Sequence, residues 1–167
     1  MTRLATAALT RFEFPPYLTS FARSTPGQAN NKVAGQFDAE LIKIDRGKLK
    51  QVYAKLDDMK TWHANWDDYN ANKPNAKAIK KAEQFIKELF EFTEQLQCAW
   101  LSPNITASSD GEVLLEWWGK EKDLTIYLSA TEITYIKVKH DDIDNMEDGN
   151  LDLNKNIIGS LWEWFII

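Results

Sequence analysis

The chain has 167 residues, 44% of them hydrophobic and 27% charged, with a net charge of −5, which suits one domain with a hydrophobic core. Its single cysteine, Cys98, excludes an internal disulfide framework and favours a reducing compartment, so we expect a cytoplasmic protein. The longest apolar stretch, residues 157–167, is shorter than the roughly 17–25 residues of a membrane-spanning helix, so we expect no membrane contact.

Residues 1–36 differ from the rest of the chain in charge and composition. They hold four basic residues and one acidic residue, or +3, which leaves −8 for the remainder. Aromatic residues are concentrated there at Phe12, Phe14, Tyr17 and Phe21, whereas a disordered tail is poor in aromatic residues. We therefore predict an N-terminal arm that binds a partner chain, followed by a single domain at residues 37–167. The alternatives are an arm that packs on its own sheet, a nucleic-acid-binding arm and a transit peptide.

Two helices are predicted next, because apolar side chains recur at helical spacing in residues 38–62 and 74–97. The apolar stripe of the second helix comprises Ile79, Ala82, Phe85, Ile86, Leu89, Phe90 and Leu96. Asn72 or Asn75 is expected to cap this helix, and Pro74 suits its first turn.

The apolar spacing then changes to two, which is typical of strands with one buried face. The predicted strands are residues 104–107, 113–118, 124–129 and 133–138. A terminal helix follows at residues 155–167, with Ile157, Leu161, Trp164 and Phe165 expected to face inward. The order of elements predicts an α+β fold: two N-terminal helices, a four-stranded antiparallel meander, and a C-terminal helix packed on the sheet.

The run Asn65–Ala71, with the sequence NWDDYNA, resembles a motif, NWDGYGA, of a widespread uncharacterised bacterial family. The stretch from Pro103 to Trp117 is similar to the same family's P…DG…LEW pattern, through Asp110-Gly111 and Leu115-Glu116-Trp117. The resemblance covers about residues 60–129. It implies a fold class and a bacterial origin, and it implies no activity, cofactor or catalytic residue.

This chain has Asp68 and Asn70 where the family motif has glycines. Asp and Asn are the residues other than glycine that best tolerate a positive φ, so we expect the loop to keep its shape. We predict a structural role for the motif: Asn65 and Asp67 bond the loop backbone, and Trp66 is buried between the two helices.

No spacing of polar residues supports a catalytic or metal-binding constellation. His140 begins an acidic segment, residues 141–152, which we predict to be a loop that is solvated or faces a basic partner. That segment fails the EF-hand pattern because Met146 and Lys155 stand at ligand positions. Cys98 has no basic neighbour in sequence that would lower its pKa, so we expect it to be inert. We therefore expect no catalytic residue, no cofactor and no bound metal. A metal-dependent hydrolase that uses His140 and the acidic segment is the least favoured alternative.

Four lysines, Lys73, Lys77, Lys80 and Lys81, crowd the start of the second predicted helix, where the helix dipole disfavours positive charge. Together with Trp62 they suggest a contact with phosphate, nucleic acid or an acidic partner. The other interpretation is a solvated basic face.

The aromatic arm, the apolar C-terminus and the lack of catalytic motifs favour a non-enzymatic, protein-interaction subunit of a bacterial multi-protein assembly. A defence, toxin–antitoxin or mobile-element system is the expected setting. We expect another protein chain as the partner, with Trp164 and Phe165 joining the arm as contact residues. The alternative is a nucleic-acid-binding accessory protein, which salt-dependent RNA binding would favour.

Overall fold

The computed structural model describes residues 46–139 and 142–167, which belong to one compact unit of the chain. Several predicted features lie outside the described residues, including the N-terminal arm and the first part of the first predicted helix. The site residues among them are Phe12, Phe14, Tyr17, Phe21, His140 and Asp141.

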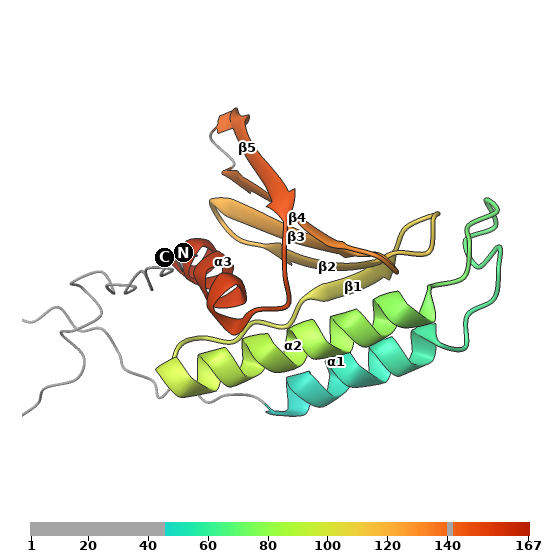
Figure 1. The fold of residues 1–167 in the computed structure, drawn as a ribbon, viewed down its shortest axis with the longest axis horizontal. Helices are drawn as coiled ribbons and strands as arrows, with labels where there is room; N and C mark the ends of the chain where they lie inside the picture. The colour runs from blue at the N-terminus through green and yellow to red at the C-terminus, as the bar shows by residue number, and fades with distance from the viewer. Residues whose placement is uncertain (1–45, 140–141) are drawn as a thin grey trace, which may run out of the picture. The chain divides into compact units, whose positions relative to one another are not determined.

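The helices α1 (Arg46–Met59) and α2 (Ala76–Leu96) lie side by side (Figure 1). The side chain of Asn75 caps α2 by accepting a hydrogen bond from the Lys77 backbone N–H, so Pro74 precedes the helix instead of occupying its first turn. The apolar stripe of α2 is buried except at Leu96, which is exposed because it lies in the last turn.

The sheet has five antiparallel strands in the order β1-β2-β3-β4-β5, so the prediction of four strands was wrong. The strands are β1 (Asn104–Ala107), β2 (Val113–Trp118), β3 (Lys122–Leu128), β4 (Ile133–Lys139) and β5 (Asp142–Asn150). The fifth strand replaces most of the predicted acidic loop. Its sequence lacks apolar alternation and is rich in Asp and Asn, which are depleted in strands, but its backbone pairs with β4 from Thr134 to Lys137.

The helix α3 (Lys155–Ile166) starts at its N-cap Asn154 and packs against α2 and the sheet. Its buried side chains are Ile158, Leu161, Trp162 and Phe165, at the spacing of one helical face. The prediction of an inward Ile157 and Trp164 is therefore corrected: Ile157 is 42% exposed and Trp164 is half-buried.

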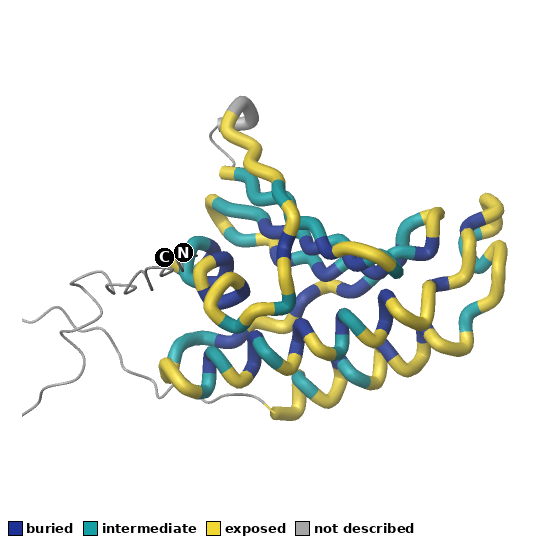
Figure 2. Tube along the Cα trace, in the orientation of Figure 1, coloured by how far each residue is buried: buried dark blue, intermediate teal, exposed yellow. Residues whose placement is uncertain are grey.

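The core lies between the helices and one face of the sheet, as the buried segments in Figure 2 show. A row of aromatic rings in contact crosses the core. The ring centroid of Trp117 in β2 lies 6.3 Å from that of Phe85 in α2 and 5.6 Å from that of Trp162 in α3, and the centroids of Trp162 and Phe165 lie 5.5 Å apart. The indole N–H of Trp162 donates to the Ala99 carbonyl oxygen at 2.9 Å, which fixes the rotation of α3 on the core.

Candidate functional site

The loop between α1 and α2 is held in shape by its own side chains. Asp67 Oδ1 accepts hydrogen bonds from the backbone N–H groups of Tyr69 (2.9 Å) and Ala71 (3.1 Å), and Asn65 Oδ1 accepts one from Asn70 (2.8 Å). The first of these bonds does most to lower the pKa of Asp67. These are the backbone bonds that the sequence predicted for Asn65 and Asp67.

Three residues of this loop have a positive φ: Asn65 (65°), Asp68 (63°) and Asn70 (68°). Asp68 and Asn70 are the positions where the resembled motif has glycines, and both have the positive φ that glycine adopts most easily. The neighbouring turn between β1 and β2 anchors the loop, since Asn75 N–H donates to the Gly111 carbonyl oxygen at 2.8 Å. Gly111 has a φ of 82°, and a Cβ there would lie 2.6 Å from a backbone oxygen.

Trp66 is half-buried, which corrects the prediction that it is buried between the helices. Its ring lies 4.7 Å from that of Trp62, and its indole N–H donates to the Asn72 carbonyl oxygen at 3.1 Å. The ring therefore packs within the loop and on the edge of the core. Tyr69 at the same loop is 87% exposed.

The four lysines predicted to contact phosphate or an acidic partner differ in their surroundings. Lys77 and Lys80 are exposed on the first turns of α2, whereas Lys81 Nζ reaches the Glu132 carbonyl oxygen at 3.4 Å. Lys73 is exposed in the preceding loop, and its backbone oxygen lies close to Gly111.

Trp62 contacts a different lysine from the four in that set. Lys55 of α1 lies 4.8 Å from the Trp62 ring centroid, and the indole N–H donates to Asp58 Oδ2 at 3.1 Å. The Trp62 side chain is thus bound to the end of α1.

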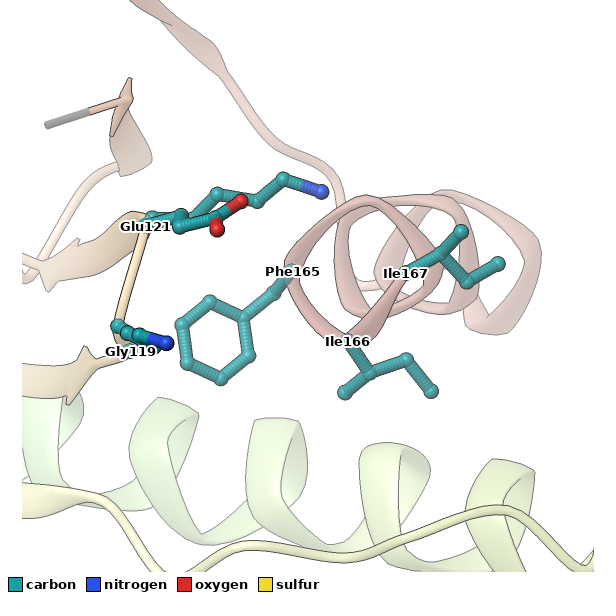
Figure 3. Close-up of a pocket in the computed structure, with 7 residues that line it drawn as sticks. Gly119, Glu121, Phe165, Ile166 and Ile167 are labelled. Atoms are coloured by element: carbon teal, nitrogen blue, oxygen red, sulfur yellow. The ribbon is translucent and has the colours of Figure 1, made fainter. Parts of the chain in front are cut away.

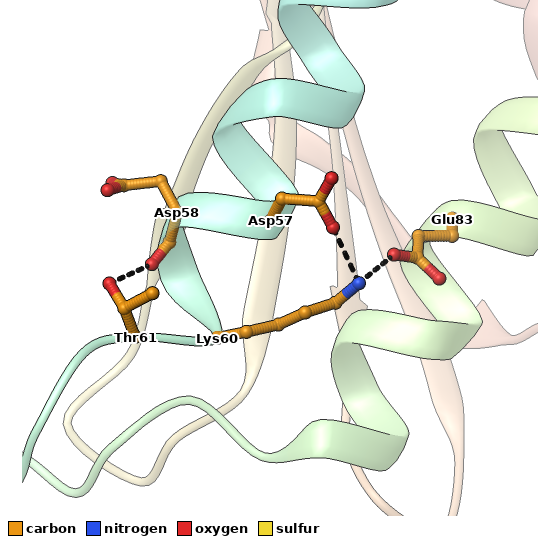
Figure 4. Close-up of polar contacts among 5 residues, drawn as sticks. All are labelled: Asp57, Asp58, Lys60, Thr61 and Glu83. Atoms are coloured by element: carbon orange, nitrogen blue, oxygen red, sulfur yellow. Dashed lines mark hydrogen bonds and ion pairs between the residues drawn. The ribbon is translucent and has the colours of Figure 1, made fainter.

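Lys60 joins the two long helices. Its Nζ lies 2.6 Å from Asp57 Oδ1 and 2.7 Å from Glu83 Oε1 (Figure 4). Hydrogen bonds to Asp57 and then to Glu83 raise the pKa of Lys60 above its ordinary range. This cluster fixes the end of α1 against α2.

The C-terminal contact residues predicted from sequence are covered by the protein itself. Phe165 is 8% exposed, and its ring points toward Gly119 at an open pocket of about 180 Å³ (Figure 3). Trp164 lies under Lys122 and Lys137, at 5.4 and 5.3 Å from their Nζ atoms, and Lys122 Nζ also donates to its carbonyl oxygen at 2.8 Å. In the described chain neither residue offers an open contact surface.

Most of the acidic segment forms the strand β5, which corrects the prediction of a loop, whereas its residues 145–148 are exposed to solvent as predicted. Lys137 Nζ of β4 lies 2.8 Å from Glu147 Oε1, and the Tyr135 hydroxyl donates to the same oxygen at 3.2 Å. The hydrogen bond from Lys137 is the main reason that the pKa of Glu147 is lowered. Across residues 46–139 and 142–167, no three His, Cys, Asp or Glu side chains are grouped so that they could hold a metal ion.

Cys98 follows α2 and is half-buried. Burial is the largest cause of a raised pKa for its thiol, and the nearby Glu163 adds to it. A raised pKa disfavours the reactive thiolate, in agreement with the expectation of an inert cysteine.

The sheet face turned away from the helices was not identified from the sequence. In β2 the buried residues Val113, Leu115 and Trp117 alternate with Leu114, Glu116 and Trp118. Because successive side chains of a strand point to opposite faces, the second set lies on the side opposite α2 and α3. We call this side the open face, since within residues 46–139 and 142–167 the aromatic contacts of α2 and α3 are on the other side.

Five large apolar side chains lie on the open face: Leu114, Trp118, Tyr127, Ile136 and Val138. Leu114 is directly opposite Tyr127 in the β2–β3 ladder, and Ile136 and Val138 follow on β4. Trp118 is 64% exposed. The alternation that predicted the strands also contains this set, but it does not tell which face the helices cover.

No protein-family model matches the chain, and comparisons with curated sequences and with solved structures found no significant match. The resemblance to the NWDGYGA family therefore stays an expectation. Among the helices that the structure describes, none has the length and apolar character needed to cross a membrane.

Proposed function

We propose that this protein is a non-enzymatic interaction subunit that binds a partner protein across the open face of its sheet. The observation that carries the proposal is Trp118, which is 64% exposed on the same sheet face as apolar side chains from three adjacent strands. Contiguous apolar surface of this kind marks protein-binding sites, and tryptophan is enriched among the residues that dominate binding energy.

The open face suits a protein partner better than a small molecule. The side chains that form it stand on a regular ladder of β2, β3 and β4, so they present a broad and rigid surface. Small-molecule sites are concave and enclose most of the ligand, whereas protein interfaces are broad, with an apolar centre and a polar rim. On the open face, Thr125 and Thr134 supply polar groups between the apolar side chains.

A bacterial assembly, such as a defence, toxin–antitoxin or mobile-element system, is the setting we propose for this subunit. Support for that setting is limited to the motif resemblance at residues 65–71 and 103–117. The predicted arm at residues 1–36 remains a second proposed contact surface.

Affinity purification of tagged full-length protein from its native host tests the proposal. Trp118→Glu places a charge at the most exposed apolar residue of the open face and is expected to weaken partner binding by about 2 kcal/mol or more. Gln84→Glu, at an exposed position of α2, adds the same charge away from the open face and should leave binding unchanged. Equal recovery of every co-purifying protein by the two variants would reject the open face as the binding surface.

A further inference from the structure

Among the described side chains of the strands, those with a charge on the open face are all acidic. Its carboxylates are Glu116 of β2, Asp123 of β3 and Asp148 of β5, which share the face with the apolar set by strand alternation and register. The lysines of the same strands alternate to the helix side: Lys122 Nζ bonds the Trp164 carbonyl oxygen, and Lys137 pairs with Glu147.

Two of the three carboxylates lie directly opposite apolar side chains, whereas Glu116 lies opposite Asn104 and Thr125. Asp123 is directly opposite Trp118 on one side and Val138 on the other, and Asp148 is directly opposite Ile136. Directly opposite residues have Cβ atoms about 4.5–5.5 Å apart, which is within reach of one long side chain. A guanidinium group suits the pair of Trp118 and Asp123, because it stacks on an indole ring and is attracted to a carboxylate; Asp123 Oδ1 is buried, so the contact would be made through Oδ2.

We propose that the open face receives a cationic segment of a partner protein, in which Arg or Lys side chains alternate with apolar ones. The inference rests on the proposed function and adds the chemistry of the partner. The apolar side chains of the segment would cover Leu114, Tyr127 and Ile136, and its basic side chains would reach Glu116, Asp123 and Asp148. Complementary charge across an interface raises the association rate and selects against wrong partners.

The same charges disfavour three other occupants: a second copy of the chain, nucleic acid and an anionic lipid surface. A second copy of the open face would bring three carboxylates against three carboxylates, and like charges across an interface cost several kcal/mol. Nucleic acid and anionic lipid surfaces carry negative charge that these side chains repel. A cationic protein segment satisfies both the apolar and the acidic part of the surface.

A random peptide library displayed against full-length protein tests this inference, with a parallel selection on Trp118→Ser. Peptides enriched by the wild type and lost with Trp118→Ser are expected to have a net positive charge. For the tightest such peptide, Glu116→Gln combined with Asp148→Asn should weaken binding by about three- to tenfold, and added salt should weaken it further. Glu116→Gln keeps an oxygen that can accept the bond from Asn104 Nδ2 (2.9 Å), so folding should be preserved.

Glu88→Gln combined with Asp110→Asn removes two charges elsewhere and should leave peptide affinity unchanged. If the peptides that depend on Trp118 are neutral or acidic, the cationic partner is wrong while the open face stands as a binding surface. If no enriched peptide depends on Trp118, the proposed function itself fails at this surface. A stable dimer of the full chain that Trp118→Ser dissociates would make a second copy the occupant and overturn the inference.

Discussion

Replacement of Asn70 tests the loop geometry, because Asn70 holds a φ of 68°. For a residue with a Cβ, the left-handed conformation is unfavourable by about 1–2 kcal/mol, whereas for glycine it has no steric penalty. The penalty is smaller for asparagine than for alanine, since the short polar side chain of asparagine tolerates this conformation. The free energy of unfolding of Asn70→Gly is therefore expected to exceed that of Asn70→Ala by about 1 kcal/mol.

Gln84 provides the matched control, because it is exposed within the regular helix α2. There the order should reverse, with Gln84→Ala more stable than Gln84→Gly by about 1 kcal/mol. Urea denaturation followed by tryptophan fluorescence measures all four variants. Alanine as the more stable residue at both positions would show that Asn70 does not hold the left-handed conformation.

Three further predictions test packing, thiol reactivity and acid stability. Gly159→Ala should lower the free energy of unfolding by about 1–3 kcal/mol more in the wild-type background than in the Phe92→Ala background, as measured by urea denaturation, because a Cβ at position 159 would lie 2.2 Å from the Phe92 ring. A difference below about 0.5 kcal/mol between the two backgrounds contradicts this contact. Because burial raises the pKa of Cys98, iodoacetamide should alkylate it more slowly in the folded than in the urea-unfolded protein; equal rates would argue against burial. The backbone bond from Tyr69 lowers the pKa of Asp67, so its contribution to stability is present above the ordinary pKa of 3.8 and is lost as pH falls through the lower folded value. NMR titration should find that the pKa of Asp67 is below 3.8 in the folded protein, and a pKa at or above 3.8 contradicts the bond. In Asp67→Asn, the free energy of unfolding should fall less steeply as the pH is lowered than in the wild type.

The strands from residue 104 to 139 were predictable because one of their faces is buried. In β2, Val113, Leu115 and Trp117 alternate with less buried residues, and this period survives in the sequence. The strand β5 was missed for the opposite reason. Its pairing with β4 rests on backbone hydrogen bonds, and polar residues such as Asp148 and Asn150 give no hydropathy pattern from which such pairing could be predicted.

The rotation of α3 was not predictable, because residues 157–167 are apolar on nearly every side of the helix. Tertiary contacts select Trp162 over Trp164 as the buried indole: Trp162 bonds the Ala99 carbonyl oxygen, and Gly159 allows Phe92 to approach the helix closely. The loop shape, by contrast, was predictable at Asp68 and Asn70, because few residue types tolerate a positive φ.

The open face follows from alternation once the helices are placed, but the sequence does not say which side of the sheet they cover. Leu114 and Trp118 stand next to buried residues, so a sequence window gives them the same apolar character as the core. Their exposure is a property of the tertiary arrangement.

Site-specific photo-crosslinking in the native host tests the open face most directly. A benzophenone side chain would replace Trp118 in one variant and the exposed Gln84 of α2 in the other. The proposal predicts one dominant protein adduct from position 118, which Tyr127→Ser in the same chain diminishes, and no such adduct from position 84. The same adducts from both positions, or an adduct from position 84 alone, would contradict binding through the open face.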